Sequence, residues 1–201
     1  MHDLDLTCGV AVRLSALCLT PSGRLRSYDL WDLAVRGALL VDLALAGRIV
    51  DEDDSVVVDP TPTGFAPADA LLAPMAVEPE QPLDWWLDSG AVDLEDLARD
   101  NVSSGRWGLR RRVVGRRYVI HDDASVIADL GRDPQSPRAD WDPATAAVMA
   151  VADASGVLEL PPKEPAEATL AATGELRWLC QAVVDRLDVV HTLFRGTVGI
   201  A

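Results

Sequence analysis

Six arginines lie between Gly105 and His121, in the stretch GRWGLRRRVVGRRYVIH, which has no acidic residue. The whole chain has a net charge of -14, and removing these six of its 18 basic residues leaves 12 against 32 acidic residues, a balance of -20. Guanidinium groups bind phosphate oxygens in bidentate fashion, so arginine is suited to anionic headgroups. The candidate contacts are Arg106, Arg110, Arg111, Arg112, Arg116 and Arg117.

Membrane attachment and protein pairing both explain this basic stretch. Each basic residue near an anionic bilayer contributes about 1 kcal/mol, so six are ample for reversible attachment. Trp107 and Tyr118 suit a membrane interface, and Leu109 could dip into it. Alternatively, the arginines pair with the acidic body of the protein, or with a second copy in a homodimer formed through residues 106–120. Both interpretations stay open at this point.

Nucleic-acid binding and catalysis are less well supported by the sequence. A helix followed by a basic hairpin also describes a winged-helix wing, but the helices lack a basic recognition face and the acidic chain would repel DNA. The sequence contains no nucleophile elbow, phosphate loop, dinucleotide fingerprint or paired-cysteine motif. His121 to Asp123 is expected to be a strand-end turn and Asp51 to Asp54 a solvated turn. We therefore expect no nucleic-acid partner, no enzyme activity, no metal and no cofactor.

Length and composition indicate one cytoplasmic domain over residues 1–201. A chain of this size can bury a single core, and its apolar fraction of 49% is ordinary. No apolar run approaches the ~20 residues that span a bilayer, and MHDLDL lacks a basic leader. Cys8, Cys18 and Cys180 are expected to be reduced and mostly buried. Arginine outnumbers lysine 17 to one, a bias typical of GC-rich codons that suggests a high-GC bacterial source.

The hydrophobic pattern predicts a mainly α, compact, bundle-like domain with two β-hairpins. Leu30 to Leu45 is apolar on most faces and is expected to be a buried helix, with Trp85 and Trp86 as packing anchors in another. Leu4 to Thr20 alternates loosely, residues 127–142 are expected to be an irregular connection, and residues 159–169 a Pro-rich surface linker. The remaining helices are expected over residues 67–75, 82–90, 92–102, 143–156 and 176–194, and the hairpins over residues 48–58 and 107–120.

Five strings in a fixed order resemble the Golgi phosphoprotein 3 family, including its bacterial members of the actinobacterial type. They are RGALLVDLALAGRI from Arg36, PTGFAPADALL from Pro62, the WWL pair, NVSSGRW before the second hairpin, and PATAAVMAVADASGVL from Pro143. The resemblance covers roughly residues 10 to 195. It implies a compact helical domain without catalytic activity. It also implies binding of phosphatidylinositol 4-phosphate at Golgi membranes through a Trp and several arginines, with the hairpin assisting membrane contact or self-association.

The family's lipid-binding residues are only partly present in this chain. Arg36 falls on one of the phosphate-binding arginines, whereas the family's Trp falls at Ser27, with Tyr28 and Trp31 nearby as substitutes. Two further family arginines fall at Ala91 and Leu94. Arg24 and Arg26, in the preceding loop, could supply further guanidinium forks. The alternative for Arg36 is an ion pair with Asp32, four residues earlier.

These observations predict a non-catalytic binding module for a phosphoinositide or another anionic phospholipid, cytoplasmic and peripheral to the membrane. The headgroup candidates are Arg36, Arg24, Arg26, Tyr28 and Trp31, and the hairpin candidates are the arginines above with Trp107, Leu109 and Tyr118. The alternative function is a soluble scaffold for a protein partner, with a degenerate lipid site. The absent family arginines favour this alternative, and the basic hairpin favours the first.

Overall fold

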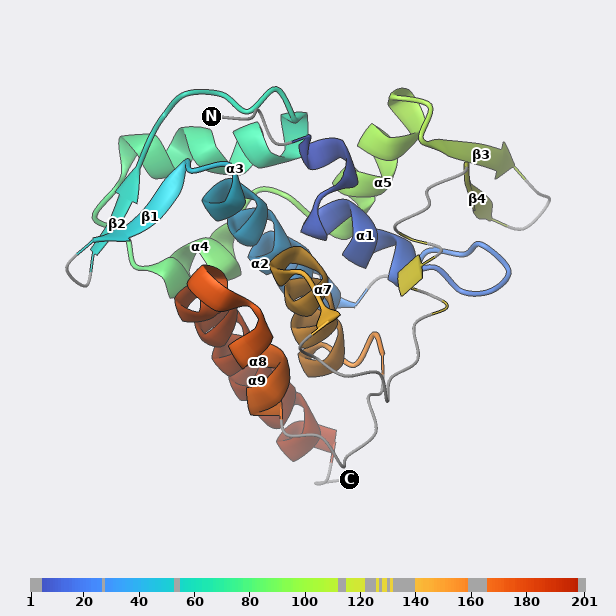
Figure 1. Ribbon diagram of the computed structural model, residues 1–201. Coiled ribbons are helices and arrows are strands. Elements are labelled where there is room, and N and C mark those ends of the chain that lie inside the picture. Colours follow the sequence, from blue (N-terminus) through green and yellow to red (C-terminus); the bar gives the residue numbers. More distant parts are fainter. Residues whose placement is uncertain are drawn as a thin grey trace.

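The computed structural model describes residues 5–26, 28–52, 55–111, 115–121, 126, 128–129, 131, 140–158 and 166–198, except for the side chains of 166 and 194–198. The chain is mainly helical with two antiparallel hairpins, as the sequence predicts (Figure 1). The helices are α1 (Val10–Leu17), α2 (Asp29–Leu45), α3 (Ala66–Val77), α4 (Leu83–Ser89), α5 (Leu94–Ser103), α7 (Pro143–Ala154), α8 (Ala166–Ala172) and α9 (Arg177–Val198). The strands are β1 (Ile49–Glu52), β2 (Ser55–Val58), β3 (Trp107–Arg111) and β4 (Arg116–Ile120), and two short 3-10 turns are η1 (Leu6–Cys8) and η3 (Gly174–Leu176).

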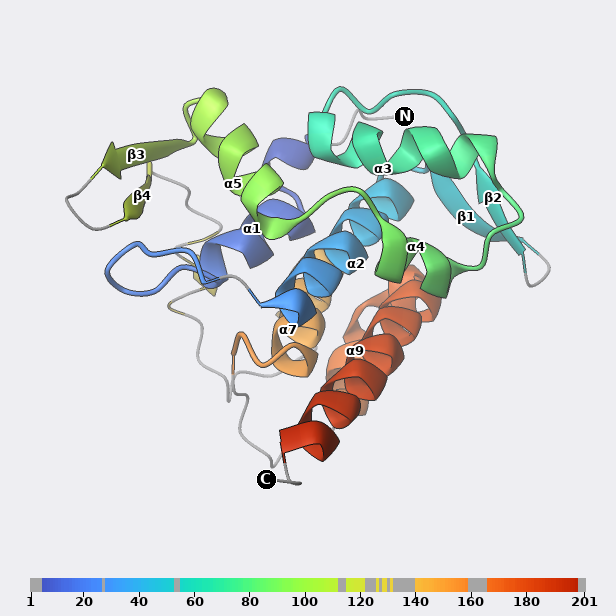
Figure 2. The same cartoon turned by 180° about the vertical axis from the view of Figure 1, so that it is seen from behind.

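Helix α2 runs through the centre of the molecule and is surrounded by α1, α3, α4, α7 and α9 (Figures 1 and 2). Its apolar residues point to every side, so a helix of this composition is stable only when other helices cover it. At Gly37 the crossing with α9 is so close that a Cβ atom would lie 2.4 Å from Val183 Cγ1. The predicted buried helix at Leu30 to Leu45 is confirmed, with one residue added at its start.

Two buried polar contacts hold α1 in place. Asp42 of α2 accepts hydrogen bonds from the backbone N–H groups of Val10 (2.7 Å) and Ala11 (2.9 Å), which have no partner inside α1. Arg13 donates to both carboxylate oxygens of Asp129 at 2.7 Å and to Thr145 Oγ1 in α7. The loosely alternating N-terminal stretch is therefore a buried helix, and its position determines where the following loop leaves the body.

The two hairpins lie at opposite ends of the molecule (Figures 1 and 2). In the first, Ile49 is buried and opposite Val58, so the β1–β2 hairpin packs its base against α2 and α3. In the second, the β3–β4 hairpin continues directly from α5. Between α5 and the preceding α4, Asp93 caps α5 by accepting from Asp96 N–H at 2.8 Å.

Two predicted connections contain helix. The segment 159–169 was predicted as a surface linker, but α8 begins at Ala166, directly after Pro165, because Ala-Glu-Ala favours helix and Thr169 and Leu170 are buried. In the predicted irregular connection 127–142, Ala128 and Asp129 have helical backbone. The rest of that connection before residue 140, apart from residue 131, and the linker before Ala166 lie outside the described residues.

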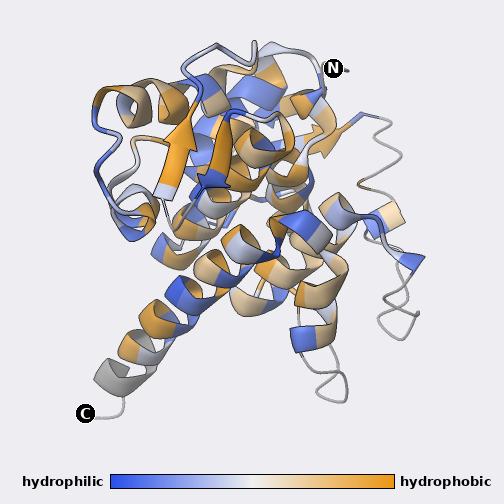
Figure 3. Ribbon diagram, turned by 60° about the vertical axis from the view of Figure 1, so that its left-hand side comes forward, coloured by the Kyte–Doolittle hydropathy of each residue, from blue (hydrophilic) through white to orange (hydrophobic). Residues whose placement is uncertain are grey.

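The cysteine and tryptophan side chains differ in burial. Cys18 and Cys180 are buried and Cys8 is exposed, and Trp86 is buried beside the partly exposed Trp85. Figure 3 shows polar and apolar residues alternating along α9 towards the C-terminus. Among the described residues, none of the helices combines the length and the apolar composition needed to cross a bilayer.

Candidate functional site

The β3–β4 hairpin places arginine opposite arginine at its tip. Arg110 pairs with Arg117 and Arg111 with Arg116 in the antiparallel register. Residues two apart share one face of a strand, so Arg111 and Arg116 lie on one face and Arg110 and Arg117 on the other. Like charges directly opposite each other destabilise a strand pair. The tip therefore concentrates positive charge on both faces at a cost in hairpin stability.

The tip arginines differ in their contacts with acidic side chains. Arg116 forms an exposed ion pair with Glu95 of α5 at 2.9 Å. No acidic side chain among the described residues pairs with Arg110 or Arg111, and both are exposed. Arg112 lies outside the described residues. Within the described part of the chain, Arg110 and Arg111 are thus not neutralised by an acidic side chain.

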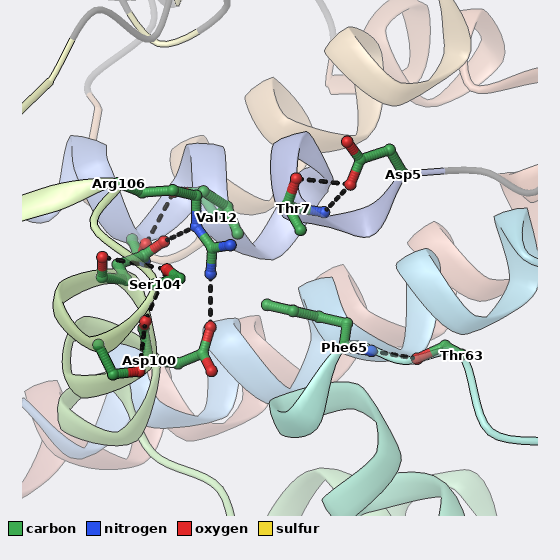
Figure 4. Close-up of polar contacts among 11 residues, drawn as sticks. Asp5, Thr7, Val12, Thr63, Phe65, Asp100, Ser104 and Arg106 are labelled. Carbon is green, nitrogen blue, oxygen red and sulfur yellow. Dashed lines mark hydrogen bonds and ion pairs between the residues drawn. The ribbon is translucent and has the colours of Figure 1, made fainter.

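Arg106, at the base of the hairpin, has a structural role instead. Its guanidinium donates to Asn101 Oδ1 at 2.7 Å and pairs with Asp100 at 2.5 Å, and it lies 5.6 Å from the centre of the Phe65 ring. Figure 4 shows the guanidinium between α5 and Phe65, at the start of α3. Arg106 therefore ties the hairpin to the body and is half-buried.

The two aromatic residues of the hairpin pack inward. Trp107 is 2% exposed and Tyr118 8% exposed, and their rings meet edge to face at 5.8 Å. They share one face with Leu109, and Ala16 and Ala98 pack against that face. In this conformation that face covers α1 and α5, so Trp107 and Tyr118 make internal contacts, and their role at a membrane interface stays a prediction. Leu109 alone of the three is exposed, at 38%.

The loop between α1 and α2 brings Arg24 beside the hairpin. Gly23 O accepts from Tyr118 N–H at 2.8 Å, and a Cβ at Gly23 would lie 2.3 Å from Tyr118 O. Gly23 also has a φ of 73°, a conformation that favours glycine. The backbone contact fixes the position of the next residue, Arg24, although almost a hundred residues separate it from β4.

Arg24 and β4 line one hollow of about 500 Å³ together with the starts of α2 and α5. Its basic residues come from the loop and β4, and its acidic residues come from the two helices. The complete lining is Arg24, Leu25, Asp32, Asp93, Leu94, Glu95, Gly115, Arg116, Arg117 and Tyr118. We call this depression the hairpin hollow.

The other predicted headgroup residues lie outside this lining. Arg26 and Tyr28 are exposed, Tyr28 at 55%, and the Tyr28 ring meets Trp31 edge to face at 5.0 Å. Trp31 is 8% exposed and its Nε1–H donates to Ser155 O at 3.1 Å. Trp31 therefore packs against the end of α7 in this conformation, and its contact with a headgroup stays a prediction. Ser27 lies outside the described residues.

Arg36 binds backbone carbonyls. Its Nε–H donates to Leu87 O at 2.5 Å and Nη1 donates to Val92 O at 3.3 Å, so the guanidinium closes the connection between α4 and α5. Burial lowers the pKa of Arg36, and nearby carboxylates, Asp32 first, act in the opposite direction. Neither the headgroup fork nor a direct ion pair with Asp32 describes these contacts. Arg36 instead positions the chain that enters the hairpin hollow at Asp93.

Asp32 is a partly buried acidic residue of the hairpin hollow, and its pKa is shifted. Burial raises its pKa, partly opposed by the hydrogen bond that Oδ1 accepts from Leu94 N–H at 3.0 Å. Sequence reasoning did not select Asp32, Asp93 or Glu95 as site residues. In the sequence these three residues appear only as acidic residues near the starts of helices. Acidic residues are common there because they cap helices, so the pattern does not indicate a binding site.

Metal and cofactor chemistry finds no support in the described residues. No three His, Cys, Asp or Glu side chains among them lie close enough to hold an ion. His121 Nδ1 is 3.2 Å from Gly105 O, consistent with a turn at the end of β4. Asp122 and Asp123, which belong to the same predicted turn, lie outside the described residues. The charged residues that line the hairpin hollow can bind charged groups.

The sequence matches a model of a known protein family. The model described as Golgi phosphoprotein 3 (GPP34) matches residues 14–188. A comparison with curated proteins gives no match. The matched range begins within α1, includes α2, both hairpins and the hairpin hollow, and ends within α9. Because the match extends over most of its length, the chain belongs to the Golgi phosphoprotein 3 family.

Proposed function

We propose that this protein is a single-domain, non-catalytic module that binds anionic phospholipid at a membrane surface through the tip of the β3–β4 hairpin. The observation that carries the proposal is the placement of Arg110 opposite Arg117 and Arg111 opposite Arg116. Such pairs weaken a hairpin, so an anionic surface that neutralises them would recover stability. Family membership adds support, because members of the family bind phosphatidylinositol 4-phosphate at Golgi membranes.

The energetics suit reversible attachment. Four tip arginines near an anionic bilayer contribute about 1 kcal/mol each. The net charge of -14 opposes binding, but screening over about 8 Å confines each interaction to nearby charges. Figures 1 and 2 show the hairpin extending from one end of the helical body, so its tip can approach a bilayer first. The cytoplasmic face of a membrane, which carries anionic lipid, is the proposed location.

The binding surface differs from the one predicted from the family pattern. The hairpin hollow joins Arg24 to β4, whereas Arg36 and Trp31 make internal contacts. The headgroup contacts we propose are therefore Arg24, Arg116 and Arg117, with Arg110 and Arg111 as electrostatic contacts. Arg36 is a positioning residue for the α4–α5 connection.

The test is co-sedimentation with vesicles of phosphatidylcholine alone and of phosphatidylcholine mixed with phosphatidylglycerol, across a range of salt concentrations. The double variant Arg110→Ser/Arg111→Ser is compared with Arg99→Ser/Arg177→Ser, which changes the net charge equally at exposed sites on α5 and α9. We expect wild type and the control to bind the anionic vesicles and the hairpin variant to bind about tenfold or more weakly. Failure of wild type to bind at low salt, or equal losses in both variants, would contradict the proposal.

A second function is favoured by the internal contacts of Arg36 and Trp31. If those contacts persist in solution, the family's headgroup pocket is incomplete, and the exposed arginines would serve a soluble scaffold that binds an acidic protein or a second copy. The same vesicle experiment separates the two functions, since a scaffold would ignore anionic vesicles while remaining folded.

A further inference from the structure

The hairpin hollow has walls of opposite charge. Arg24, Arg116 and Arg117 come from the loop and β4, and Asp32, Asp93 and Glu95 come from α2 and α5. These six charged residues line one volume of about 500 Å³, within the range of about 300–1,000 Å³ typical of ligand pockets. The hollow as a whole is dipolar rather than basic.

The acidic wall is held in position by the fold. Asp32 Oδ1 accepts from Leu94 N–H, and Asp93 Oδ1 accepts from Asp96 N–H. Each of these carboxylates has a second oxygen that could contact a ligand. Burial raises the pKa of Asp32, and the attraction of a cation beside it would oppose that effect.

One ion pair already joins the two walls. Glu95 and Arg116 meet at 2.9 Å, and both side chains are largely exposed. This pair occupies one acid and one base and leaves Arg24 on the basic side and Asp32 with Asp93 on the acidic side. A ligand that satisfies both sides must carry an anionic and a cationic group on a short linker.

We infer that the hairpin hollow binds the headgroup of an amino phospholipid. This inference rests on the proposed function and specifies its ligand. The phosphate of the headgroup contacts Arg24 and the β4 arginines, and its primary ammonium group contacts Asp32 and Asp93. Phosphoethanolamine and phosphoserine headgroups share this chemistry. A headgroup with several phosphates fits less well, because a second phosphate would face Asp32 and Asp93.

The test compares two lipids with the same net charge. Vesicles of phosphatidylcholine with phosphatidylserine are matched, at equal mole fraction and salt, to vesicles with phosphatidylglycerol, which lacks the ammonium group. We expect wild type to bind phosphatidylserine vesicles about three- to tenfold more tightly, the range for a partly exposed charge pair. Equal binding to both would overturn the inference and leave the proposed function intact, whereas binding to neither would overturn the proposed function.

The acidic wall is tested with Asp32→Asn/Asp93→Asn. Asparagine keeps the acceptor for Leu94 N–H and remains a good N-cap, so the fold is retained. We expect phosphatidylserine binding to fall to the level of phosphatidylglycerol binding, with phosphatidylglycerol binding unchanged or tighter. The matched control is Asp84→Asn/Asp185→Asn, at exposed positions of α4 and α9, which keeps the preference. A double variant that still prefers phosphatidylserine would overturn the assignment of the ammonium group, and phosphatidylglycerol binding reports that the protein is folded.

A soluble amino phosphate has the same chemistry as the lipid headgroup. Titration of the protein with O-phosphoethanolamine, followed by amide NMR shifts, separates the two sources. We expect weak shifts near Arg24 and Asp32 together with a clear vesicle preference. Saturable binding of the free compound without any preference between the vesicles would overturn the lipid source.

Discussion

The two hairpins have the same two-stranded antiparallel topology and opposite charge. In β1–β2 the acidic residues Asp51 and Glu52 face Val56 and Ser55, so no strand pair in the described register joins two like charges. In β3–β4 two of the five pairs join arginine to arginine. Solvent is sufficient to stabilise the acidic residues of β1–β2. In β3–β4 the facing arginines repel each other, and the fold does not require that repulsion. The comparison indicates that function, not stability, determines the sequence of β3–β4.

The largest expected effect comes from removing the residue that anchors each hairpin. Trp107→Ala should destabilise the protein by about 3–5 kcal/mol and Ile49→Ala by about 2–5 kcal/mol, because both side chains are fully buried. Chemical denaturation measures both. We expect loss of vesicle binding at permissive temperature from Trp107→Ala only. Equal loss from both variants would show that the two hairpins do not differ in function.

A change of pH tests the body that carries both hairpins. Burial raises the pKa of Asp42 from 3.8 to about 7. The folded protein therefore holds this proton more tightly than the unfolded chain. The stability contributed by Asp42 is full below about pH 4 and is lost as the pH rises through about 7, by at most about 1.4 kcal/mol per pH unit.

Denaturation from pH 5 to 8 measures this slope, with Asp42→Asn expected to flatten it. Asp42 contacts the start of α1 rather than β3–β4, so vesicle binding by the folded protein should not follow the change in stability. Wild-type stability that rises between pH 5 and 7 would contradict the assignment.

Gly23→Ala should separate the loop from the basic hairpin. The added Cβ meets Tyr118 O and the backbone has a positive φ, so we expect a loss of at least about 1 kcal/mol. Binding to phosphatidylserine should weaken because Arg24 moves away from β4. Gly47→Ala, after α2, has a similar φ of 67° and open space around it, and serves as the control for backbone strain alone.

The smallest expected effect reverses the charge pattern of a single strand pair. Arg110→Glu places a carboxylate opposite Arg117 and should stabilise the protein by less than about 1 kcal/mol while weakening binding to anionic vesicles. Ser55→Glu creates a like-charge pair with Glu52 and should destabilise the acidic hairpin by a similar amount. Thermal unfolding with vesicle co-sedimentation checks both. A parallel change in stability and binding for Arg110→Glu would remove the contrast between the hairpins.

The sequence predicted the elements better than their contacts. Leucine and valine spacing located α2 to within one residue, and Gly115 between two β-rich runs located the second hairpin, because both signals are local. The orientation of Trp107 could not be predicted, since alternation in a strand identifies two faces without identifying which one is covered. Arg24 meets β4 through a backbone contact made possible by Gly23, and Arg36 is held by carbonyls of α4 and the loop after it. These tertiary contacts have no signature in a single sequence.

The separation of the two hairpins gives the molecule an electric dipole moment. Acidic residues of β1–β2 and arginines of β3–β4 lie on opposite sides of the helical body (Figure 1). In the field of an anionic membrane such a dipole experiences a torque that turns the basic end inward before any contact forms. The acidic end then faces away from the lipid. Under the proposed function, orientation would precede binding, and the same end of the molecule would always face the solvent.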